Sequence, residues 1–293
     1  MEVSYIFNNE IIRLELELTN YCNLKCPLCL RNTHPELKGN SKIEQRDFED
    51  LINQLDSFPK LKYVTLAGAI SEPASYDRLF DLLDYLAKRK IEVSLFINGD
   101  LRNDVWYKKL AIKFQKLEGH IYFTICGSTQ ELHEKYRIGS DLETVLRRVE
   151  IVKKYSRKEI LTYIIFDYNQ EDFNKNYKKY QKKFNTHFFY TLPFQEHFNS
   201  PNIPGIHLPK NLQDVYKKLD RLDDNIDCPS LRYGFRMIDF KGNVNLCSLE
   251  KIYGDSHCWE CSVNNSKILR ESKIYRIAEG EDEESEEELY VNK

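Results

Sequence analysis

Six strand-like apolar runs alternate with amphipathic, helix-like segments between residues 14 and 192, and this alternation constrains the fold strongly. The predicted strands cover residues 14–18, 63–66, 91–97, 120–125, 160–166 and 187–192. The predicted helices cover residues 43–55, 77–88, about 104–114, 142–155 and 170–184. Asn103 precedes the third of these helices and is its expected N-cap, because an asparagine side chain accepts a hydrogen bond from the first turn.

The composition of the strands indicates a parallel sheet. Residues 160–166 form an almost continuous apolar run between two helices, as expected of a parallel strand that is buried on both faces. Parallel strands joined by helices need right-handed crossovers, so we expect an α/β fold, either an open sheet or a partial barrel. In such a barrel the chemistry lies at the carboxyl ends of the strands.

Three cysteines follow the first predicted strand within eight residues, at Cys22, Cys26 and Cys29. The spacing C-x3-C-x2-C allows three thiolates to converge on one polynuclear centre. A [4Fe–4S] cluster normally takes four thiolates, so three would leave one iron with an open coordination position, as catalytic metal sites have. A zinc knuckle or an ordinary cysteine-rich loop is the alternative interpretation of this spacing.

The cysteine loop, at the end of an amino-terminal strand, resembles the signature of the radical S-adenosylmethionine (SAM) superfamily. The resemblance implies that Cys22, Cys26 and Cys29 hold a [4Fe–4S] cluster whose open iron chelates the amino and carboxylate groups of SAM. It also implies reductive cleavage of SAM to a 5′-deoxyadenosyl radical that takes a hydrogen atom from a substrate. The fold implied is α/β, a partial (β/α)6 barrel.

Two motifs after the second and third predicted strands resemble SAM-binding segments of that superfamily. Glu72-Pro73 resembles the end of a Gly-Gly-Glu-Pro type motif that grips the SAM amino group, although Ile70-Ser71 replaces the glycine pair. A carboxylate suits this role because an ammonium group needs a charged acceptor. Asn98, in Ile-Asn-Gly, resembles the family's Thr-Asn-Gly and is either a ribose contact or a turn residue.

The fourth predicted strand ends in Thr-Ile-Cys-Gly-Ser, which resembles the family's Ser-Ile-Asp-Gly-Ser segment. This resemblance makes Thr124 and Ser128 candidate ribose contacts. Arg137 becomes a candidate clamp for the SAM carboxylate, because its guanidinium offers a bidentate fork. Asn169, at the end of the fifth predicted strand, is a further candidate contact to the ribose or adenine.

Four cysteines near the carboxyl end have the spacing C-x18-C-x10-C-x2-C: Cys228, Cys247, Cys258 and Cys261. Four thiolates close a zinc site as readily as a [4Fe–4S] cluster. Together with Gly242 in a predicted hairpin, they resemble the auxiliary-cluster domain of the SPASM/twitch group. The resemblance implies a second, fully ligated [4Fe–4S] cluster for electron transfer or structural support. Cys126 is left over, and a small buried hydrophobe is a simpler explanation for it than a substrate contact.

The regular pattern breaks near residue 200, where Pro193, Pro201, Pro204 and Pro209 cluster. We predict a radical SAM core domain at 1–200, a small cysteine-rich α+β twitch-type domain at 201–265, and a carboxyl-terminal segment at 266–293. Eight acidic residues between Glu279 and Glu288 make that segment a block of like charge, typical of a disordered tail.

Composition and charge restrict the class of protein. None of the apolar runs could span a bilayer, and the amino terminus lacks a signal-peptide pattern, so we expect a cytoplasmic protein. Reduced cysteines are then metal ligands rather than disulfides. The net charge is −3, or +5 without the eight acidic residues, which is not the dense basic face expected of a nucleic-acid-binding protein. The lysine-rich segment at 170–184 is better explained as a helix with a buried aromatic stripe than as an RNA-binding surface.

These features predict a radical SAM enzyme that oxidises a small molecule or modifies a peptide, with SAM and an electron donor such as flavodoxin or ferredoxin as partners. The first predicted strand starts near residue 10, so we expect no amino-terminal leader-peptide-binding domain, which slightly favours a small molecule. The rival hypothesis is a non-catalytic, zinc-stapled binding protein that docks through its acidic tail.

Overall fold

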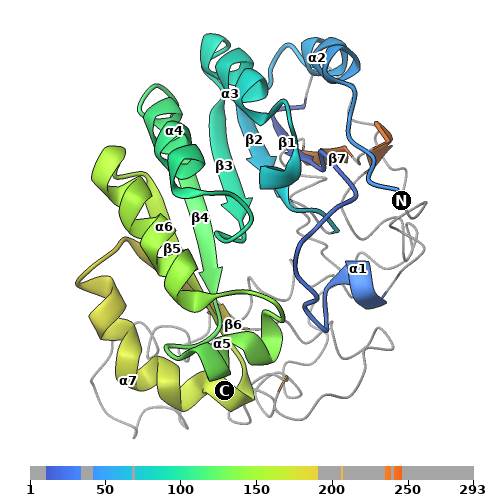
Figure 1. Ribbon diagram of the computed structural model, residues 1–293. Coiled ribbons are helices and arrows are strands. Elements are labelled where there is room, and N and C mark those ends of the chain that lie inside the picture. Colours follow the sequence, from blue (N-terminus) through green and yellow to red (C-terminus); the bar gives the residue numbers. More distant parts are fainter. Residues whose placement is uncertain are drawn as a thin grey trace, which may run out of the picture.

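One sheet forms the centre of the computed structural model, which describes residues 11–33, 42–67, 70–190, 206, 235–238 and 241–245. The strand order in this sheet is β6-β5-β4-β3-β2-β1-β7-β8. Figure 1 shows the sheet behind helices α3, α4 and α6, with the chain passing from β1 to β6 across it.

All six predicted strands are present: β1 Arg13–Leu16, β2 Tyr63–Leu66, β3 Glu92–Ile97, β4 Gly119–Ile125, β5 Glu159–Ile165 and β6 Thr186–Tyr190. Each pairs in parallel with the strand before it in the chain. An open, doubly wound sheet would reverse this order at a switch point and place helices on both faces. The sequential order is that of a barrel, so the prediction of a partial (β/α)6 barrel is confirmed.

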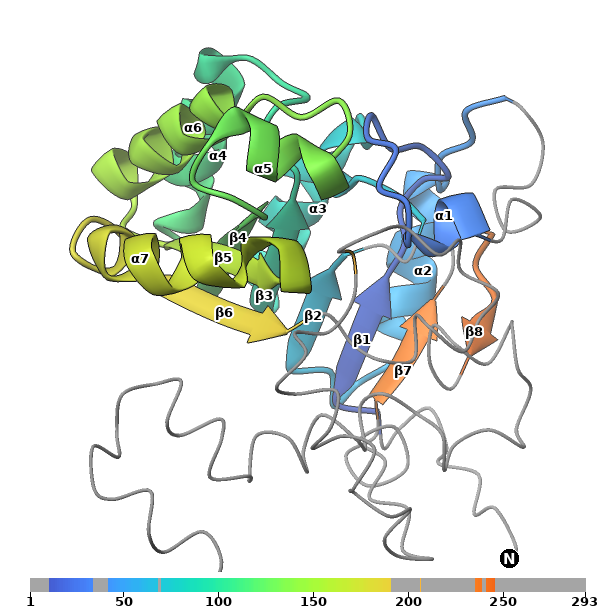
Figure 2. The same cartoon turned by 90° about the horizontal axis from the view of Figure 1, so that it is seen from below.

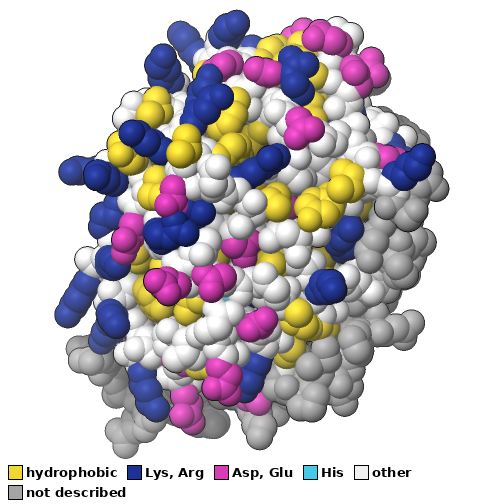
Figure 3. All heavy atoms as spheres, in the orientation of Figure 1, with side chains coloured by type: hydrophobic (Ala, Val, Ile, Leu, Met, Phe, Trp, Pro, Cys, Tyr) yellow, Lys and Arg dark blue, Asp and Glu magenta, His cyan; other side chains and the backbone are white. Residues whose placement is uncertain are grey.

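The helices are α1 Leu30–Thr33, α2 Phe48–Asp56, α3 Leu79–Lys88, α4 Asp104–Phe114, α5 Gln130–Tyr136, α6 Leu142–Tyr155 and α7 Gln170–Gln181, with 3-10 turns at η3 Pro73–Ser75 and η4 Asp167–Asn169. Figure 2 shows α3, α4, α6 and α7 on one face of the sheet. On the outer surface of this layer, basic and acidic side chains are interspersed (Figure 3), as expected of a solvated helical face.

The strands bury alternate residues against the helices. Leu14 and Leu16 on β1, and Ile121, Phe123 and Ile125 on β4, belong to one hydrophobic core and are at most 1% exposed. Successive side chains of a strand point to opposite faces, so each strand contributes only every second residue to this core. Burial of each such side chain stabilises the fold by roughly 1.5–3 kcal/mol.

Helix boundaries follow local hydrogen bonds. The Asn103 cap is confirmed, since its side chain accepts from the backbone N–H three residues later at 3.0 Å. Helix α2, in contrast, begins at Phe48 and not at residue 43. The N–H of Arg46 donates to the carbonyl of Leu18 at 2.9 Å, which holds the preceding residues against the end of β1, and Asp47 then caps the helix.

The predicted carboxyl-terminal hairpin is present as β7 (Phe235–Ile238) and β8 (Val244–Asn245), which pair antiparallel. Strand β7 also pairs in parallel with β1, so the hairpin extends the central sheet. Its turn contains Gly242 at φ +90°, whose carbonyl accepts from the Gln54 side chain at 2.9 Å. Arg46 donates to the same Gln54 side chain at 3.0 Å, which connects the hairpin to α2.

The described residues contain no helix that is both long and apolar enough to cross a bilayer. Four predicted metal ligands lie outside the described residues: Cys228, Cys247, Cys258 and Cys261. The proline cluster, the acidic block and the predicted boundary near residue 200 also lie there, so the predictions for them stand as predictions.

We expect Gly242→Ala to lower the free energy of unfolding more than Gly139→Ala. Both glycines have φ near +90°, which costs an alanine about 1–2 kcal/mol. At Gly242 a Cβ would also lie 2.6 Å from Nη1 of Arg46, whereas at Gly139 the nearest atom is 3.9 Å away. Moving the end of the Arg46 side chain away would disturb its hydrogen bond to Gln54 and should add about 0.5–1.5 kcal/mol, measurable by urea unfolding. Equal losses in both variants would show that Arg46 does not hold the turn.

Candidate active site

The three cysteines of the amino-terminal motif lie in the loop between β1 and α1. Cys26 is 8% exposed, while Cys22 and Cys29 are half-buried, and none forms a disulfide. The carbonyl of Cys26 accepts from the N–H of Cys29 at 3.1 Å and from the side chain of Asn32 at 2.7 Å, so the loop folds back on itself. The N–H of Lys25 donates to the carbonyl of Ile138 at 3.1 Å, which joins the loop to the segment after α5.

The environment of these thiols disfavours thiolates when no metal is bound. Burial raises the pKa of Cys22 and Cys26, and it raises that of Cys29 to about 12. A thiolate at Cys26 would also raise the pKa of Cys22 and of Cys29, and a thiolate at Cys22 would raise that of Cys29. A metal centre supplies the positive charge that deprotonates such thiols.

The three thiols do not form a ready-made site for a single ion. Among the described residues, no three His, Cys, Asp or Glu side chains are arranged to hold one metal ion. In an iron–sulfur cluster each cysteine binds its own iron, so the sulfurs need not meet at one atom.

A buried chain of polar contacts joins the cysteine loop to the ends of β3 and α5. The Arg137 guanidinium donates to Oδ1 of Asn98 at 2.7 Å. The amide of Asn98 donates to Sγ of Cys22 at 3.3 Å and to Oδ1 of Asn23 at 2.8 Å. Asn23 in turn donates to Oδ1 of Asp100 at 2.7 Å, and Oδ2 of Asp100 is buried without a hydrogen-bond partner. The cysteine loop is therefore held by residues from distant parts of the chain.

Glu72 lies at the centre of this arrangement and is 2% exposed. Its two carboxylate oxygens accept from the N–H groups of Ala74 at 3.2 Å and Asn98 at 2.9 Å. Its own N–H donates to the carbonyl of Tyr21, next to the first cysteine, at 2.7 Å. Burial raises the pKa of Glu72 to about 8, even though the backbone donors and Arg137 oppose the rise.

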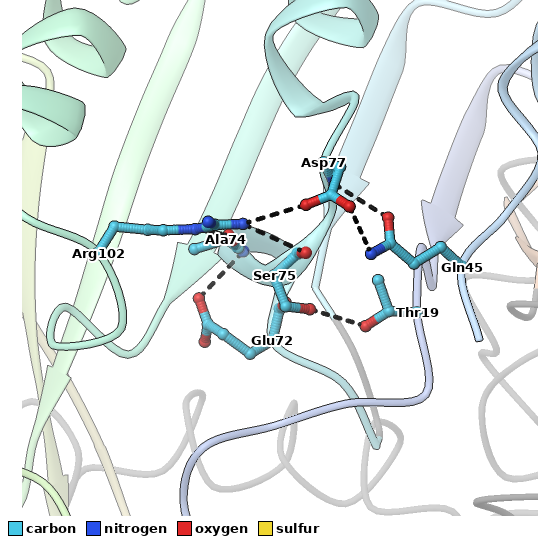
Figure 4. A network of polar contacts seen from close by, with 7 residues as sticks. All are labelled: Thr19, Gln45, Glu72, Ala74, Ser75, Asp77 and Arg102. Carbon is cyan, nitrogen blue, oxygen red and sulfur yellow. Dashed lines mark hydrogen bonds and ion pairs between the residues drawn. The ribbon is translucent and has the colours of Figure 1, made fainter. Parts of the chain in front are cut away.

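Further contacts hold the turn that carries Glu72 (Figure 4). Nε of Arg102 donates to the carbonyl of Ala74 at 2.7 Å. The hydroxyls of Thr19 and Ser75 lie 2.9 Å apart, which connects the turn to the segment before the cysteine loop. These contacts fix the direction in which the Glu72 carboxylate points.

Of the three remaining predicted SAM contacts, Ser128 and Asn169 use their polar groups elsewhere. Thr124 is half-buried on β4. Ser128 bonds the carboxylate of Asp172 through its hydroxyl and through its N–H, the latter at 2.7 Å. Asn169 is fully buried and donates to the carbonyl of Cys126 at 2.8 Å and to a carbonyl of β5. The structure thus gathers Glu72, Asn98 and Arg137 at the cysteine loop. Ser128 instead joins the end of β4 to α7, and Asn169 joins the ends of β4 and β5.

Cys126 is fully buried in an apolar cluster with Cys26, Tyr136 and Phe166. Burial raises its pKa well above the usual range, as expected of a small hydrophobic side chain. Its N–H donates to Nδ1 of His133 at 3.3 Å, and burial lowers the pKa of that histidine to about 3. His133 is therefore neutral, and it fixes the turn that follows β4.

Arg137 provides a test of whether the site fits an anionic group. It is 9% exposed, its Nε has no hydrogen-bond partner, and no carboxylate of the described residues lies within ion-pair distance of it. Burial lowers its pKa, but the neighbouring thiols and Glu72 reverse this effect, so it stays charged. A buried cation without a counter-ion costs several kcal/mol. Three cluster-bound thiolates, or a ligand carboxylate, would supply the missing negative charge.

The sequence patterns missed two of these residues. Asn23 lies inside the cysteine loop, and Asp100 follows the Asn-Gly pair after β3. The only sequence signal for them is that both positions hold polar residues, and polar residues are also common in turns. Their contact joins positions 77 residues apart, which no local pattern reveals.

Comparison with known proteins agrees with this geometry. A sequence model described as the radical SAM superfamily matches residues 16–179, a stretch that runs from β1 to α7 and contains the cysteine loop. A "tungsten-containing aldehyde ferredoxin oxidoreductase cofactor-modifying protein" of Pyrococcus furiosus is 31% identical over 98 residues, which is 33% of this chain. The match spans only 27% of that protein.

Solved structures share the fold at low sequence identity. Streptococcus suis SuiB bound to its precursor peptide SuiA superimposes with a TM-score of 0.56 at 14% identity, over 88% of this chain and 64% of SuiB. Native anSMEcpe with bound AdoMet superimposes with a TM-score of 0.57 at 18% identity, over 94% of this chain and 92% of anSMEcpe. At such identities the likeness demonstrates the fold alone.

We expect Glu72→Gln to flatten the pH dependence of apoprotein stability. A carboxyl with a native pKa of about 8 and an unfolded value near 4.5 binds its proton more tightly in the folded state. Its contribution is therefore complete at low pH and is lost as the pH rises toward 8. Between pH 6.5 and 8.5 the wild type should lose about 1–2 kcal/mol more than the variant in urea unfolding.

The exposed residue Glu143, at the start of α6, provides the matched control. Glu143→Gln should keep the wild-type slope. Equal slopes in wild type and Glu72→Gln would show that Glu72 is not buried as described.

Proposed function

Because the chain belongs to the radical SAM superfamily, we propose that it reductively cleaves SAM and abstracts a hydrogen atom from a small-molecule or peptide substrate. The observation that carries this proposal is the three-thiol loop held against Arg137, a buried cation without a carboxylate partner among the described residues. A [4Fe–4S] cluster bound there would supply the electron for cleavage of SAM.

Different residues of the site would bind the cluster and the amino and carboxylate groups of SAM. Cys22, Cys26 and Cys29 would hold three irons. The buried Nε–H of Arg137 has no hydrogen-bond partner, and the guanidinium would clamp the carboxylate of SAM. Glu72 would accept hydrogen bonds from the amino group of SAM. Asn98 contacts both the Arg137 guanidinium and the sulfur of Cys22, so it would fix the position of the SAM-binding groups relative to the cluster.

The adenosyl part of SAM would lie further along the same edge of the sheet. Thr124 is the favoured ribose contact, because its half-buried hydroxyl lies on the strand that leads to Cys126. Ser128 would have to share its hydroxyl with Asp172. Asn169 would act mainly by fixing the strand ends through its two amide hydrogens.

For the carboxyl-terminal half we propose a twitch-type domain with a second [4Fe–4S] cluster that assists electron transfer. Its ligands would be Cys228, Cys247, Cys258 and Cys261. The hairpin that leads toward Cys247 is docked on β1 and α2, which supports a fixed position for this unit relative to the first cluster.

The overall reaction would be an oxidation or a peptide modification in the cytoplasm, with flavodoxin or ferredoxin as the electron donor. Support for a peptide comes from two proteins of similar fold: SuiB has been solved bound to a precursor peptide, and anSMEcpe bound to a Cp18Cys peptide. Support for a small molecule comes from the cofactor-modifying protein of P. furiosus.

We expect the anaerobically reconstituted wild type to contain roughly eight irons in two four-iron clusters and to form 5′-deoxyadenosine from SAM only with a reductant. Cys26→Ala should retain about four irons and lose this activity, because the first cluster loses a ligand. Cys126→Ala is the matched control and should keep iron content and activity. Stoichiometric zinc without reductant-dependent 5′-deoxyadenosine in the wild type would overturn the proposal in favour of a zinc-stapled binding protein.

Arg137→Gln should weaken SAM binding by about tenfold to a hundredfold, because a hydrogen bond to a charged group contributes about 1.5–3 kcal/mol. Equilibrium binding of SAM to the reconstituted protein measures the effect, and iron content shows whether the cluster persists. Arg147→Gln removes an exposed cation on α6 and should leave SAM affinity unchanged. Unchanged affinity in Arg137→Gln would refute the role of a carboxylate clamp.

A further inference from the structure

The face of the sheet that points away from the helices has an unusual composition. Residues that alternate with the core positions form three rows across the strands. The first row is Glu15, Thr65, Ser94 and His120; the second is Phe96, Tyr122 and Ile160; the third is Thr124, Thr162 and His187. Most of these side chains are polar or aromatic, and none belongs to the main hydrophobic core. We call this set the inner face.

An aromatic pair lies in the middle of the inner face. The rings of Phe96 and Tyr122 are stacked, with centroids 4.3 Å apart and planes 9° apart. The rings of His120 and His187 lie 6.4 and 6.0 Å from that of Tyr122. Phe96 and Tyr122 are only half-buried, so the pair retains surface that a bound group could cover.

Two polar groups on the inner face lack partners. Glu15 makes no hydrogen bond or ion pair with the described residues, and burial raises its pKa to about 7. Arg13, a cation on the same strand, lies over the ring of Tyr63 at 4.9 Å instead. The hydroxyl of Thr162, a residue that is 2% exposed, is also buried without a partner. Glu15 is half-buried. The unpaired, buried hydroxyl of Thr162 requires an explanation, and a missing ligand is one.

The inner face continues into the candidate active site. Asn98 follows Phe96 by two residues, and Cys126 follows Thr124 by two. Both positions therefore continue the inner-face alternation beyond the ends of β3 and β4. The amide of Asn98 contacts Sγ of Cys22 at 3.3 Å. The aromatic pair is therefore one row away from the residues that bind the cysteine loop.

We propose that the inner face binds a substrate that carries a cationic amine. The Glu15 carboxylate is the counter-ion of the amine, and the apolar part of the substrate packs against the rings of Phe96 and Tyr122. The proposal rests on the function proposed above and names the substrate class of the same site. The amine belongs either to a lysine side chain in a peptide or to a free small molecule.

The chemistry of the inner face selects for a cation at Glu15, because a carboxylate without a counter-ion attracts an ammonium group. The stacked rings of Phe96 and Tyr122 offer apolar surface to the rest of the substrate. Burial lowers the pKa of His120, so this histidine is uncharged near neutral pH and does not compete for Glu15. Glu15 and Phe96 lie two strands apart and are offset by two residues, a separation of about 12 Å, which suits an amine on a flexible aliphatic chain.

Saturation-transfer NMR titration of the full chain tests this proposal with three named probes. These are Nα-acetyl-lysine methylamide, its uncharged counterpart Nα-acetyl-norleucine methylamide, and 1,5-diaminopentane. The lysine probe should bind at least tenfold more tightly than the norleucine probe. Glu15→Gln should remove this preference, Glu15→Asp should largely keep it, and the exposed control Glu143→Gln should leave it unchanged.

Tighter binding of the lysine probe than of the diamine would assign the amine to a peptide, and the reverse would assign it to a small molecule. Equal affinity for lysine and norleucine, a preference that survives Glu15→Gln, or no binding of either amine would overturn the proposal. The titration needs neither SAM nor reductant, so its result is independent of the test for 5′-deoxyadenosine. Thermal unfolding of Glu15→Gln shows whether the variant is folded.

Discussion

The buried positive charge of Arg137 is the constraint on which the candidate site depends. Its guanidinium is held by Asn98 and lies near the thiols of the cysteine loop, yet no carboxylate of the described residues pairs with it. An isolated buried cation is costly, so a fold that retains one needs a negative group at the same place. The three thiols are the obvious source, but burial keeps them protonated until a metal binds. Cluster binding and charge neutralisation are therefore coupled in this site.

Alternate residues along each strand face opposite sides of the sheet, so the residues of the hydrophobic core and the residues of the inner face are different sets. One set of positions, such as Leu14 and Phe123, is fully buried against the helices and carries the hydrophobic core. The other set, such as Glu15 and Tyr122, leaves polar and aromatic groups on the inner face below the cysteine loop. Because a one-residue shift in register would exchange the two sets, the parallel pairing that stabilises the sheet also places the binding groups.

Sequence reasoning located features that depend on local patterns. The strands follow from short apolar runs, and the cysteine loop and Asn103 follow from residue type and spacing. It missed features that depend on contacts between distant segments. Pairing of β7 with β1 joins residues more than 200 positions apart, and the bond from Ser128 to Asp172 redirects a hydroxyl that the motif assigned to a ligand. The late start of α2 has the same origin, since backbone pairing with the end of β1 competes with the helix.

The central claim is that a three-cysteine cluster keeps one iron open for SAM. Electron–nuclear double resonance on the reduced, SAM-bound protein tests it most directly, with 15N in the amino group of SAM and 17O in its carboxylate. We expect hyperfine coupling of both labels to the spin of the cluster. Absence of both couplings in a protein that contains a full complement of iron and binds SAM would contradict the account.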